Sequence, residues 1–521
     1  MYKLGIVGFG VVGKSVLMFL NGKKSDYQVP FDQQLFDEKV DGDCFKVNVW
    51  DKRSLTQQEV EIIKVYGGVL VDGTSIDLRD FIKENDFIIP SPGIDLTAYQ
   101  EYNDKFLCEL DFFDTFFKKP VVAVTGSFGK TTVTKLIGKL ASELAMVDQK
   151  PDLAKQLSAA VYLEHKKQLR TVCGGNVGTG MLDVIGQQDD YDVGVIELSS
   201  FQLELNKKFT PDIAVWTNLY PNHLDRHRDL EQYFQAKFNL IRYQHEHQAV
   251  IFSDEVFTGP SGHLVNGLLT DIKAMVCISS NKAIDVDFIC SINRETFYLF
   301  SVVDHWITVS KVHNQAVTLI SKLVDTRLLP PVTFTQNWIQ VIAALYLLGN
   351  DVAAFPAWLE NNADQQLLDD LHHRVEHVGT VRGVDFYNDS KSTVIQTTQA
   401  AVEKLALLGR PLIVIVGGLG KGVDRSPLDA YLASAPQIKK RYCFGKDCGS
   451  FASCAITPTL EAVMNDVASI MQPGDIVLFS PSGSSFDLFK NYEHRGQVFK
   501  ELVGQLGARA EERAVSTHLE G

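Results

Sequence analysis

The stretch from Val121 to Thr132 constrains this chain more than any other, and it reads VVAVTGSFGKTT. Its apolar run predicts a buried strand, and the Gly-Lys-Thr-Thr sequence after a glycine-containing turn predicts that a helix starts at once. Backbone N–H groups and the positive helix end converge at such a turn, which attracts phosphate. We therefore expect Lys130 to reach the β and γ phosphates of a nucleotide and the Thr131 hydroxyl to bind Mg²⁺.

The spacing of this loop departs from G-x-x-x-x-G-K-[ST], because Val124 and Thr125 stand where the first glycine would be sought. An ordinary turn between a strand and a helix is the alternative interpretation. The combination of strand, Gly-Lys-Thr-Thr and helix favours the phosphate loop.

Short runs rich in Val and Ile alternate with amphipathic stretches along most of the sequence. This alternation is typical of an α/β protein built around largely parallel sheets. Polar residues interrupt the apolar pattern near 111–119 and 361–372, which predicts three domains at 1–115, 116–370 and 371–521. The stretch 253–331 has mixed strand-like runs and carries no chemical motif.

The composition excludes several classes of protein. The 521 residues include 50 Lys and Arg against 64 Asp and Glu, a net charge of −14, and 45% are hydrophobic. This balance is typical of a globular chain and argues against a partner that is nucleic acid. The longest apolar runs, such as 412–416 and 341–348, fall well short of the ~20 residues that cross a bilayer, so we expect no membrane partner.

The cysteines indicate a reducing compartment. The eight cysteines are scattered and include no C-x-x-C pair, so we expect neither a zinc site nor a disulfide framework. The apolar run from Leu4 to Leu20 contains three glycines at motif spacing, at positions 8, 10 and 13, and also Lys14, and no small-residue cleavage site follows it. We therefore expect a cytoplasmic protein rather than a secreted one.

A second glycine motif, GFGVVG at Gly8–Gly13, follows the first predicted strand. It matches the dinucleotide fingerprint G-x-G-x-x-G, with Asp51 at the end of a later strand as the ribose ligand, although Asp51 lies further on than the usual ~20 residues. Three interpretations stay open at this point: NAD, the diphosphate of a mononucleotide, or only a tight turn.

Two further strand ends in the second domain carry polar groups. Glu197 ends a buried strand and begins ELSSFQL, where a carboxylate opposite a phosphate loop is well placed to hold Mg²⁺. A solvated strand end is the alternative. His223, Asp225 and Arg226 follow another strand and crowd the same edge of the sheet, which favours a role in a site.

Lys237 occupies an unusual place in the predicted helix 229–243. Its neighbours at helical spacing include Tyr233, Phe234 and Leu240, so it falls on the apolar face. The pattern alone favours a lysine that extends its amine to solvent.

Polar segments at 373–376, 387–393, 417–424 and 480–496 each follow a predicted strand of the third domain. They therefore project from one sheet edge, where open α/β sheets bind ligands. Lys391 and Lys421 together could hold an acidic substrate, although loop lysines on an acidic protein are also commonly solvated.

Taken together, these segments closely resemble the Mur ligases, the ATP-dependent amino-acid ligases of peptidoglycan synthesis. The resemblance rests on T-G-x-x-G-K-T-T, E-L-S-S-F-Q-L, N-H-L-D-R, H-R-x-E, N-D-S-K and S-x-D-x-F-K-N-Y-E-x-R-G, which occur here in the family's order. It extends from Lys3 to about Leu506, with 253–331 unmatched. Within the family, the resemblance is to the member that adds D-glutamate to UDP-N-acetylmuramoyl-L-alanine.

The resemblance implies a monomer with an N-terminal Rossmann-like domain for the UDP part, a central P-loop ATPase domain and a C-terminal Rossmann-like domain for the amino acid. It implies ATP and two Mg²⁺ ions as cofactors, and a cytoplasmic reaction. The L-alanine carboxylate would attack the γ-phosphate to give an acyl phosphate, which the D-glutamate amine would then attack.

The resemblance also implies roles for individual residues. Those around the UDP substrate would be Gly10, Val11, Val12, Asp51, Arg53, Ser91, Gly93, Asn176, Ser199 and His223. Those around ATP would be Gly126, Ser127, Phe128, Gly129, Lys130, Thr131, Thr132, Asn337, Arg374 and Asp389. Those around D-glutamate would be Lys391, Thr393, Lys421, Ser485, Phe486 and Tyr492. The metal ligands would be Thr131, Glu197, His223 and a carbamylated Lys237, and the catalytic residues Lys130, Glu197, His223, Lys237 and Lys391.

Two departures from the family pattern stand out. The helix on the adenine side usually reads H-N-x-x-N, whereas this chain has QNWIQ at 336–340, and Leu419-Gly420 precedes Lys421 where the family more often has an acidic residue. The alternatives are a sister ligase that adds another amino acid, a folylpolyglutamate synthase-type enzyme, and a non-ligase protein that binds NAD. Gly8–Gly13 and Ser484–Gly496 argue against the folate branch.

Overall fold

The computed structural model describes residues 2–22, 45–176, 179–259, 262–330, 333–362 and 372–519. The chain divides into two compact units: unit 1 comprises Met1–Tyr220 and Glu231–Leu367, and unit 2 comprises Pro221–Leu230 and Leu368–Gly521. Three separate sheets confirm the predicted α/β class. The domain boundary predicted at 370 lies outside the described residues, and the boundary at 115 falls within helix α4 (Glu109–Phe116).

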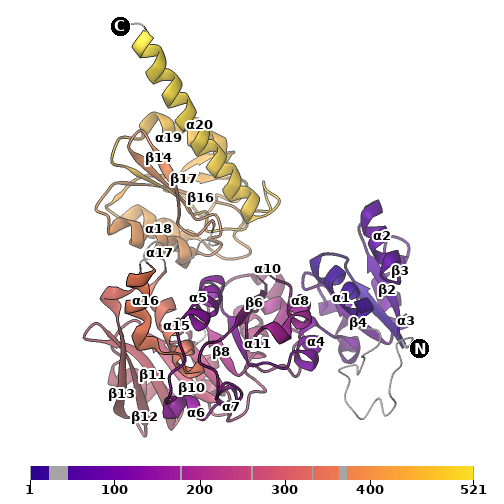
Figure 1. Ribbon diagram of the computed structural model, residues 1–521. Helices are drawn as coiled ribbons and strands as arrows, with labels where there is room; N and C mark the ends of the chain where they lie inside the picture. Colours follow the sequence, from indigo (N-terminus) through magenta and orange to yellow (C-terminus); the bar gives the residue numbers. More distant parts are fainter. Residues whose placement is uncertain are drawn as a thin grey trace. The chain divides into compact units, whose positions relative to one another are not determined.

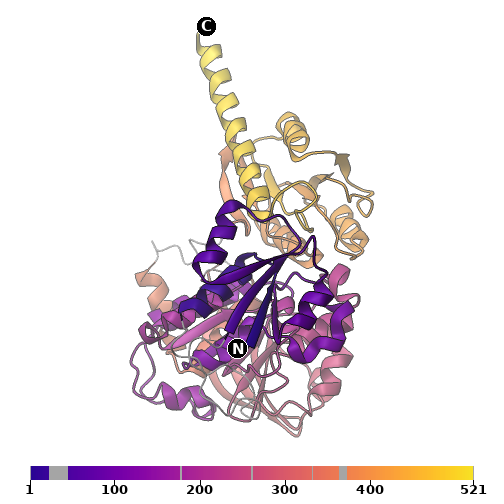
Figure 2. The same cartoon turned by 90° about the vertical axis from the view of Figure 1, so that its right-hand side faces the viewer.

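The N-terminal sheet has four parallel strands in the order β3-β2-β1-β4. Its strands are drawn in indigo in Figure 2. Its strands are β1 (Tyr2–Val7), β2 (Phe45–Asp51), β3 (Gly68–Asp72) and β4 (Phe87–Pro90). Its helices are α1 (Val11–Gly22), α2 (Gln57–Val65), α3 (Leu78–Glu84) and the 3₁₀ segment η1 (Thr97–Lys105). A Cβ on Gly13 would lie 2.2 Å from Gly8 O, so glycine lets α1 start close against β1.

The central sheet has nine strands in the order β13-β12-β11-β10-β9-β8-β5-β7-β6 (Figure 1). Strands β5 to β11 are parallel, and β12 and β13 follow as antiparallel hairpins. The strands are β5 (Val121–Thr125), β6 (Thr171–Gly175), β7 (Val193–Glu197), β8 (Ile213–Trp216), β9 (Ala249–Ser253), β10 (Met275–Ser280), β11 (Thr296–Val303), β12 (Trp306–His313) and β13 (Ala316–Asp325).

Helices connect the strands of this domain or follow its last strand. They are α5 (Lys130–Glu143), α6 (Asp152–Lys155), α7 (Ser158–Tyr162), α8 (Met181–Gly186), α9 (Ser200–Leu203), α11 (Leu230–Phe238), α12 (Glu255–Thr258), α13 (Gly262–Leu268), α14 (Val286–Ser291), α15 (Thr335–Leu348) and α16 (Phe355–Asn361), with 3₁₀ segments η2 (Gln188–Asp190), η3 (Thr326–Leu328) and η4 (Val352–Ala354). Helix α15 is buried from Gln336 to Leu348, as its nearly uninterrupted apolar sequence requires.

The stretch 253–331, which carries no motif, completes this central sheet. It supplies β10 to β13, and its hairpins turn at Asp304-His305 and Asn314-Gln315, where each residue has a positive φ. Such turns match the twist of antiparallel strands. The mixed pattern in the sequence therefore reflects the change from parallel to antiparallel strands.

The C-terminal sheet has six strands in the order β14-β15-β19-β16-β17-β18, in which only the β14–β15 pair is antiparallel. The strands are β14 (Glu376–Val381), β15 (Val384–Asn388), β16 (Leu412–Gly417), β17 (Ile438–Phe444), β18 (Ala455–Thr457) and β19 (Ile476–Phe479). The helices of unit 2 are α10 (Leu224–His227), α17 (Ile395–Ala406), α18 (Ser426–Ser434), α19 (Leu460–Ile470) and the long α20 (Tyr492–Leu519). No helix among the described residues is both long and apolar enough to cross a membrane.

One expectation about the cysteines is wrong. Cys443 at the end of β17 is joined to Cys448 by a disulfide, although the sequence predicts no disulfide framework. The loop after β17 places the two Cα atoms 6.0 Å apart, a proximity that the spacing of the cysteines does not predict. Outside this pair, the described cysteines are free thiols.

Candidate active site

The phosphate loop has the predicted geometry: β5 ends at Thr125 and α5 begins at Lys130. Gly126 has a φ of +143° and Gly129 a φ of +81°. A Cβ on Gly126 would lie 2.0 Å from Thr217 Oγ1, and one on Gly129 would lie 2.9 Å from Asn337 Oδ1. Both positions therefore require glycine, and Asn337 lies against the loop.

The loop is held by Thr217 and Asn218, which directly follow the neighbouring strand β8 and for which the sequence predicts no role. Asn218 Oδ1 accepts hydrogen bonds from Ser127 N at 3.1 Å and Phe128 N at 3.0 Å. Thr217 Oγ1 donates to Phe128 O at 2.6 Å. Their only signal in the sequence is a polar pair directly after a buried strand.

Lys237 lies beneath this loop, so the prediction of a solvent-directed lysine is wrong. The residue is 1% exposed, and its Nζ donates to Gly126 O at 2.9 Å and lies 3.4 Å from Thr125 Oγ1. The amine also lies over the Tyr233 ring, 4.6 Å from its centroid. Burial, reinforced by the charge of Lys130, lowers the pKa of Lys237 well below its usual range.

Glu197 is the acidic member of the same group of charges. It ends β7 beside Val124 of β5 and is 1% exposed, which excludes a solvated strand end. Asn176 Nδ2 donates to Glu197 Oε1 at 2.8 Å, and Asn176 N donates to Glu197 O at 2.9 Å. The charge of Glu197 partly opposes the lowering of the Lys237 pKa. The structure thus gathers Lys130, Glu197 and Lys237 at one point.

The donor set at this point suits a hard cation. The Glu197 carboxylate and the buried Thr131 hydroxyl supply oxygen atoms, the ligand type that Mg²⁺ prefers. The described residues contain no cluster of three His, Cys, Asp or Glu side chains that could hold a metal by themselves. Mg²⁺ commonly takes its remaining ligands from water and substrate phosphates, so these two residues fit a magnesium–nucleotide complex.

The two glutamines that depart from the family pattern have structural roles. Gln336 Nε2 donates to Ser253 Oγ at 2.8 Å and Ser279 O at 3.0 Å, and Gln340 Nε2 donates to Thr217 O at 3.3 Å. Both side chains are buried, and they tie α15 to the ends of β8, β9 and β10. Between them, Asn337 remains next to the phosphate loop.

In the N-terminal domain, the structure brings Asp51, Arg53 and Ser91 to the Gly8–Gly13 turn. Asp51 Oδ2 accepts from Phe9 N at 2.8 Å and from Arg53 Nη2 at 2.8 Å, and Ser91 Oγ donates to Gly8 O at 2.9 Å. Burial disfavours the charge of Asp51, but the Arg53 guanidinium and the Phe9 N–H hold the pKa of the carboxyl below its usual range.

Other residues predicted around the UDP substrate are accessible at the same edge. Val11 is exposed, Val12 is half-buried, and a Cβ built on Gly10 or Gly93 would meet no described atom within 4 Å. Ser199 lies on the central domain, where its hydroxyl caps α9 by accepting from Gln202 N at 3.3 Å.

In unit 2, Asp389 is a buried carboxyl at the end of β15. Its Oδ2 accepts from Ser480 Oγ at 2.7 Å and its Oδ1 from Val375 N at 3.3 Å. Burial raises the pKa of Asp389 to about 7, although Ser480 and the charge of Arg374 act in the opposite direction. Lys391 Nζ lies over the Tyr492 ring, 4.8 Å from its centroid.

The other predicted amino-acid ligands lie on loops of the same sheet edge. Leu419 and Ser484 exchange two backbone hydrogen bonds of 2.8 Å, which joins the loop of Lys421 to that of Ser485. Ser485 is buried, Thr393 is half-buried and Phe486 is exposed. Lys421 Nζ lies 3.5 Å from Nδ1 of His223, whose segment belongs to unit 2.

Two combinations stay predictions because their members belong to different units. Lys130, Glu197 and Lys237 lie in unit 1, whereas Arg374, Asp389 and the amino-acid ligands lie in unit 2. The sharing of a metal by His223 of unit 2 and Lys237 of unit 1 stays a prediction for the same reason.

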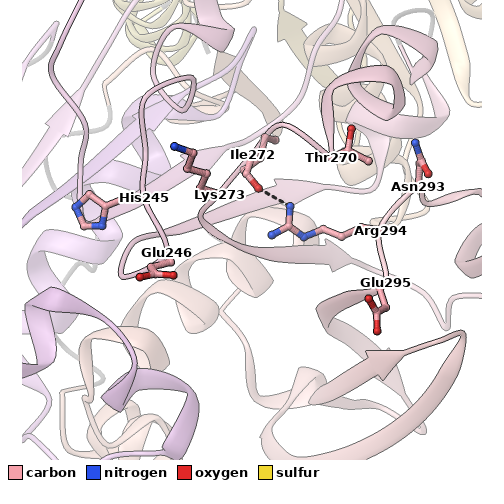
Figure 3. A pocket seen from close by; sticks show the side chains of 8 residues that line it. All are labelled: His245, Glu246, Thr270, Ile272, Lys273, Asn293, Arg294 and Glu295. Carbon is pink, nitrogen blue, oxygen red and sulfur yellow. Dashed lines mark hydrogen bonds between the residues drawn. The ribbon is translucent and has the colours of Figure 1, made fainter.

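A separate pocket, drawn in Figure 3, lies beside the amino ends of strands in the central sheet. Its lining residues precede β9, β10 and β11: His245, Glu246, Thr270, Ile272, Lys273, Asn293, Arg294 and Glu295. Arg294 donates there to Leu269 O, Ile272 O and Ala274 O at 2.6 to 2.8 Å. The arginine thus satisfies backbone carbonyls at the amino ends of the strands, away from the edge where α/β sheets bind nucleotides.

Comparisons with known proteins find relatives over most of this chain. Residues 124–261 match the model of the Mur ligase middle domain. The chain is 30% identical over 522 residues to the UDP-N-acetylmuramoylalanine–D-glutamate ligase of Desulfotalea psychrophila, which covers 96% of this chain and 95% of that protein. It is also 30% identical over 438 residues to the ligase of the same name from Vibrio cholerae, with 82% and 85% covered.

The fold is that of a solved relative as well. A crystal structure of MurF from Acinetobacter baumannii superposes with a TM-score of 0.51 at 14% identity, covering 89% of this chain and 90% of that chain. With the family's motifs around the phosphate loop and similarity over nearly the whole chain, this protein belongs to the Mur ligase family.

Proposed function

We propose that this protein is the ATP-dependent ligase that joins D-glutamate to UDP-N-acetylmuramoyl-L-alanine. The observation that carries the proposal is the group formed by Lys130, Glu197 and the buried Lys237 at the phosphate loop. This group suits the proposed reaction. A carboxylate and a triphosphate are both anionic, so positive charge must offset their repulsion when the carboxylate approaches. The relatives named for this activity, at 30% identity, support the choice of amino acid.

In the proposed reaction, the L-alanine carboxylate oxygen forms a bond to the γ-phosphorus while the bond to the ADP oxygen breaks. Lys130 holds the β and γ phosphates, and bound Mg²⁺ offsets their negative charge. The D-glutamate amine then bonds to the acyl carbon, phosphate leaves, and the amine loses a proton. Arg374 faces the charge that develops on the phosphoryl group.

Lys237 acts in this proposal as a carbamate. Its lowered pKa leaves more of the amine neutral near pH 7, and only the neutral amine bonds to CO₂, with release of one proton. The product is anionic and presents oxygen atoms. It therefore adds a ligand suited to Mg²⁺ beside Glu197 and Thr131.

Substrate binding divides among three domains in this proposal. The Gly8–Gly13 domain holds UDP, the central domain ATP, and the C-terminal domain D-glutamate through Lys391 and Lys421. The enzyme works as a monomer in the cytoplasm. The acidic chain and the open positions at Gly10 and Gly93 agree with a small anionic ligand held by local contacts rather than a polyanion.

Two measurements test the proposal against its alternatives. Phosphate release from ATP is followed with UDP-N-acetylmuramoyl-L-alanine and a panel of D- and L-amino acids, and D-glutamate is expected to give the highest rate. A different preferred amino acid would identify a sister ligase. Calorimetric titration with a UDP-sugar and with NADH then tests which ligand the first domain binds. Binding of NADH without binding of the UDP-sugar would support the non-ligase alternative.

A further inference from the structure

Two neighbouring loops of the C-terminal sheet lie close together. The loop after β16, residues 417–422, carries Lys421, and the loop after β17, residues 445–448, carries Asp447. Gly418, Lys421 and Gly422 all have φ between +53° and +76°. A lysine rarely adopts this conformation by itself, so the surrounding structure must hold the loop of Lys421 in place.

Asp447 contacts the residue directly before Lys421. Its Oδ2 accepts a hydrogen bond from Gly420 N at 2.8 Å. The same carboxylate oxygen lies 3.2 Å from Arg425 Nη2, which completes an ion pair. One carboxylate therefore holds the Lys421 loop through its backbone and through a second residue a few positions later in the chain.

Arg425 is buried at the base of the two loops. Its Nη1 donates to Gly417 O at 2.9 Å, its Nη2 donates to Asp447 O, and its guanidinium lies over the Phe451 ring, 4.9 Å from the centroid. A buried charge is costly unless it is paired, so Arg425 depends on Asp447. Together the two side chains connect the start, the middle and the end of the Lys421 loop to the neighbouring loop.

The loop after β19, which contains Gly483 and Ser484, packs closely against the Lys421 loop. A Cβ on Gly418 would lie 2.3 Å from Ser484 O, and one on Gly483 would lie 2.6 Å from Gly417 O. Asp447, by contrast, has a side chain that is 45% exposed. Replacing it releases the hydrogen bond to Gly420 and the ion pair with Arg425 without opening a cavity in the core.

We infer that Asp447, paired with Arg425, is a positioning residue that sets the location of Lys421 and thereby the affinity for the acidic amino-acid substrate. The inference rests on the proposed function, in which Lys421 binds a carboxylate of D-glutamate. Asp447 does not touch the substrate. It fixes the backbone from which the Lys421 side chain extends.

Steady-state kinetics of the full-length chain tests this inference. For Asp447→Ala, KM for D-glutamate should rise about tenfold, because a backbone hydrogen bond to a charged group is lost. KM for ATP and for the UDP substrate should stay within about twofold, since those ligands use other residues. Asp447→Asn keeps an acceptor for Gly420 N–H but loses the charge, so its KM for D-glutamate should rise only about threefold.

Asp429 offers a matched control in the same domain. It accepts hydrogen bonds from Ser453 N and Ser453 Oγ and is likewise half-buried, but these contacts do not involve the Lys421 loop. Asp429→Ala should leave KM for D-glutamate unchanged. Thermal unfolding of all three variants separates a loss of folded protein from a change in affinity.

The outcomes distinguish this inference from the proposed function. An active wild type with an unchanged KM for D-glutamate in Asp447→Ala overturns the inference alone. Equal increases in all three KM values, or the same increase in Asp429→Ala, also overturn it, because they indicate general loosening of the domain. A folded wild type that releases no phosphate with any amino acid overturns the proposed function and the inference together.

Discussion

Lys130 Nζ and Lys237 Nζ both donate to the same carbonyl oxygen, Gly126 O, each at 2.9 Å. Two ammonium groups around one carbonyl repel each other, and the buried one loses most from being charged. The pKa of Lys237 is therefore lowered, first by burial and then by Lys130. The phosphate loop thus keeps one amine for the nucleotide and leaves the other available for different chemistry.

Lys130→Ala should nearly abolish turnover and leave the fold intact. The change removes a cation aimed at the β and γ phosphates, which should cost on the order of 3 kcal/mol in the barrier, or more than about a hundredfold in rate. Phosphate release measures the rate, and circular dichroism checks the fold. Activity within threefold of wild type, with an unchanged spectrum, would mean that the loop does not serve phosphoryl transfer.

Lys237→Ala should be nearly inactive and should partly recover when acetate is added. A small carboxylate can enter the vacated space and replace the oxygen ligands of the carbamate. Rates are compared with increasing acetate at constant ionic strength. Chloride in place of acetate is the control and should give no recovery.

Lys237→Arg provides the opposite test at the same position. Arginine keeps the positive charge, cannot form the carbamate and fills the space, so acetate should not restore activity. An arginine variant with substantial activity would show that a positive charge alone suffices there, and the carbamate would then be excluded.

D-glutamate should be preferred over D-alanine by about ten- to a hundredfold in kcat/KM. The reason is that Lys391 and Lys421 can pair with two carboxylates, whereas D-alanine offers only one carboxylate for a charge-assisted bond. Competition between the two amino acids in one reaction, followed by mass spectrometry, measures this ratio. Equal incorporation would contradict the assigned roles of both lysines.

Glu109 gives a prediction about stability and pH. This α4 residue is buried, and burial raises the pKa of its carboxyl from 4.5 to about 7, although Gln202 lowers it. The folded state therefore binds more protons than the unfolded state between these pH values, and stability falls as pH rises from about 4.5 to 7. Above pH 7 the full cost is present, on the order of 3 kcal/mol.

Glu109→Gln removes this titration while keeping the size of the side chain. The variant should unfold at a higher temperature than wild type at pH 8 and at nearly the same temperature at pH 4.5. Thermal unfolding at both pH values measures the difference. A constant difference across this range would mean that Glu109 is not protonated preferentially in the folded chain.

The strand–loop–helix of the phosphate site could be predicted because all its requirements are local. Gly126, Gly129 and Lys130 are adjacent in sequence, and their spacing carries the geometry. Glu197 could be placed from its position after a buried strand. The three-sheet architecture follows in the same way from alternating strands and helices.

The features that the sequence did not reveal depend on contacts between distant residues. The sequence pattern predicts that Lys237 is a surface lysine. In the structure its amine is buried against Gly126, which lies 111 positions earlier in the chain. Asn218 accepts a hydrogen bond from Phe128 N of the phosphate loop, and the two residues are 90 positions apart in the chain. The pairing of Cys443 with Cys448 and the contact of Asp447 with Gly420 arise from turns whose direction no periodicity encodes.

Transfer of ¹⁸O from substrate to phosphate tests the central claim most directly. The enzyme is supplied with ATP, D-glutamate and UDP-N-acetylmuramoyl-L-alanine labelled with ¹⁸O in both carboxylate oxygens, and the released phosphate is analysed by mass spectrometry. Because the carboxylate attacks the γ-phosphorus and one of its oxygens leaves with it, each phosphate should carry one ¹⁸O. No phosphate release in the presence of D-glutamate, or release of phosphate without the label, would contradict the account.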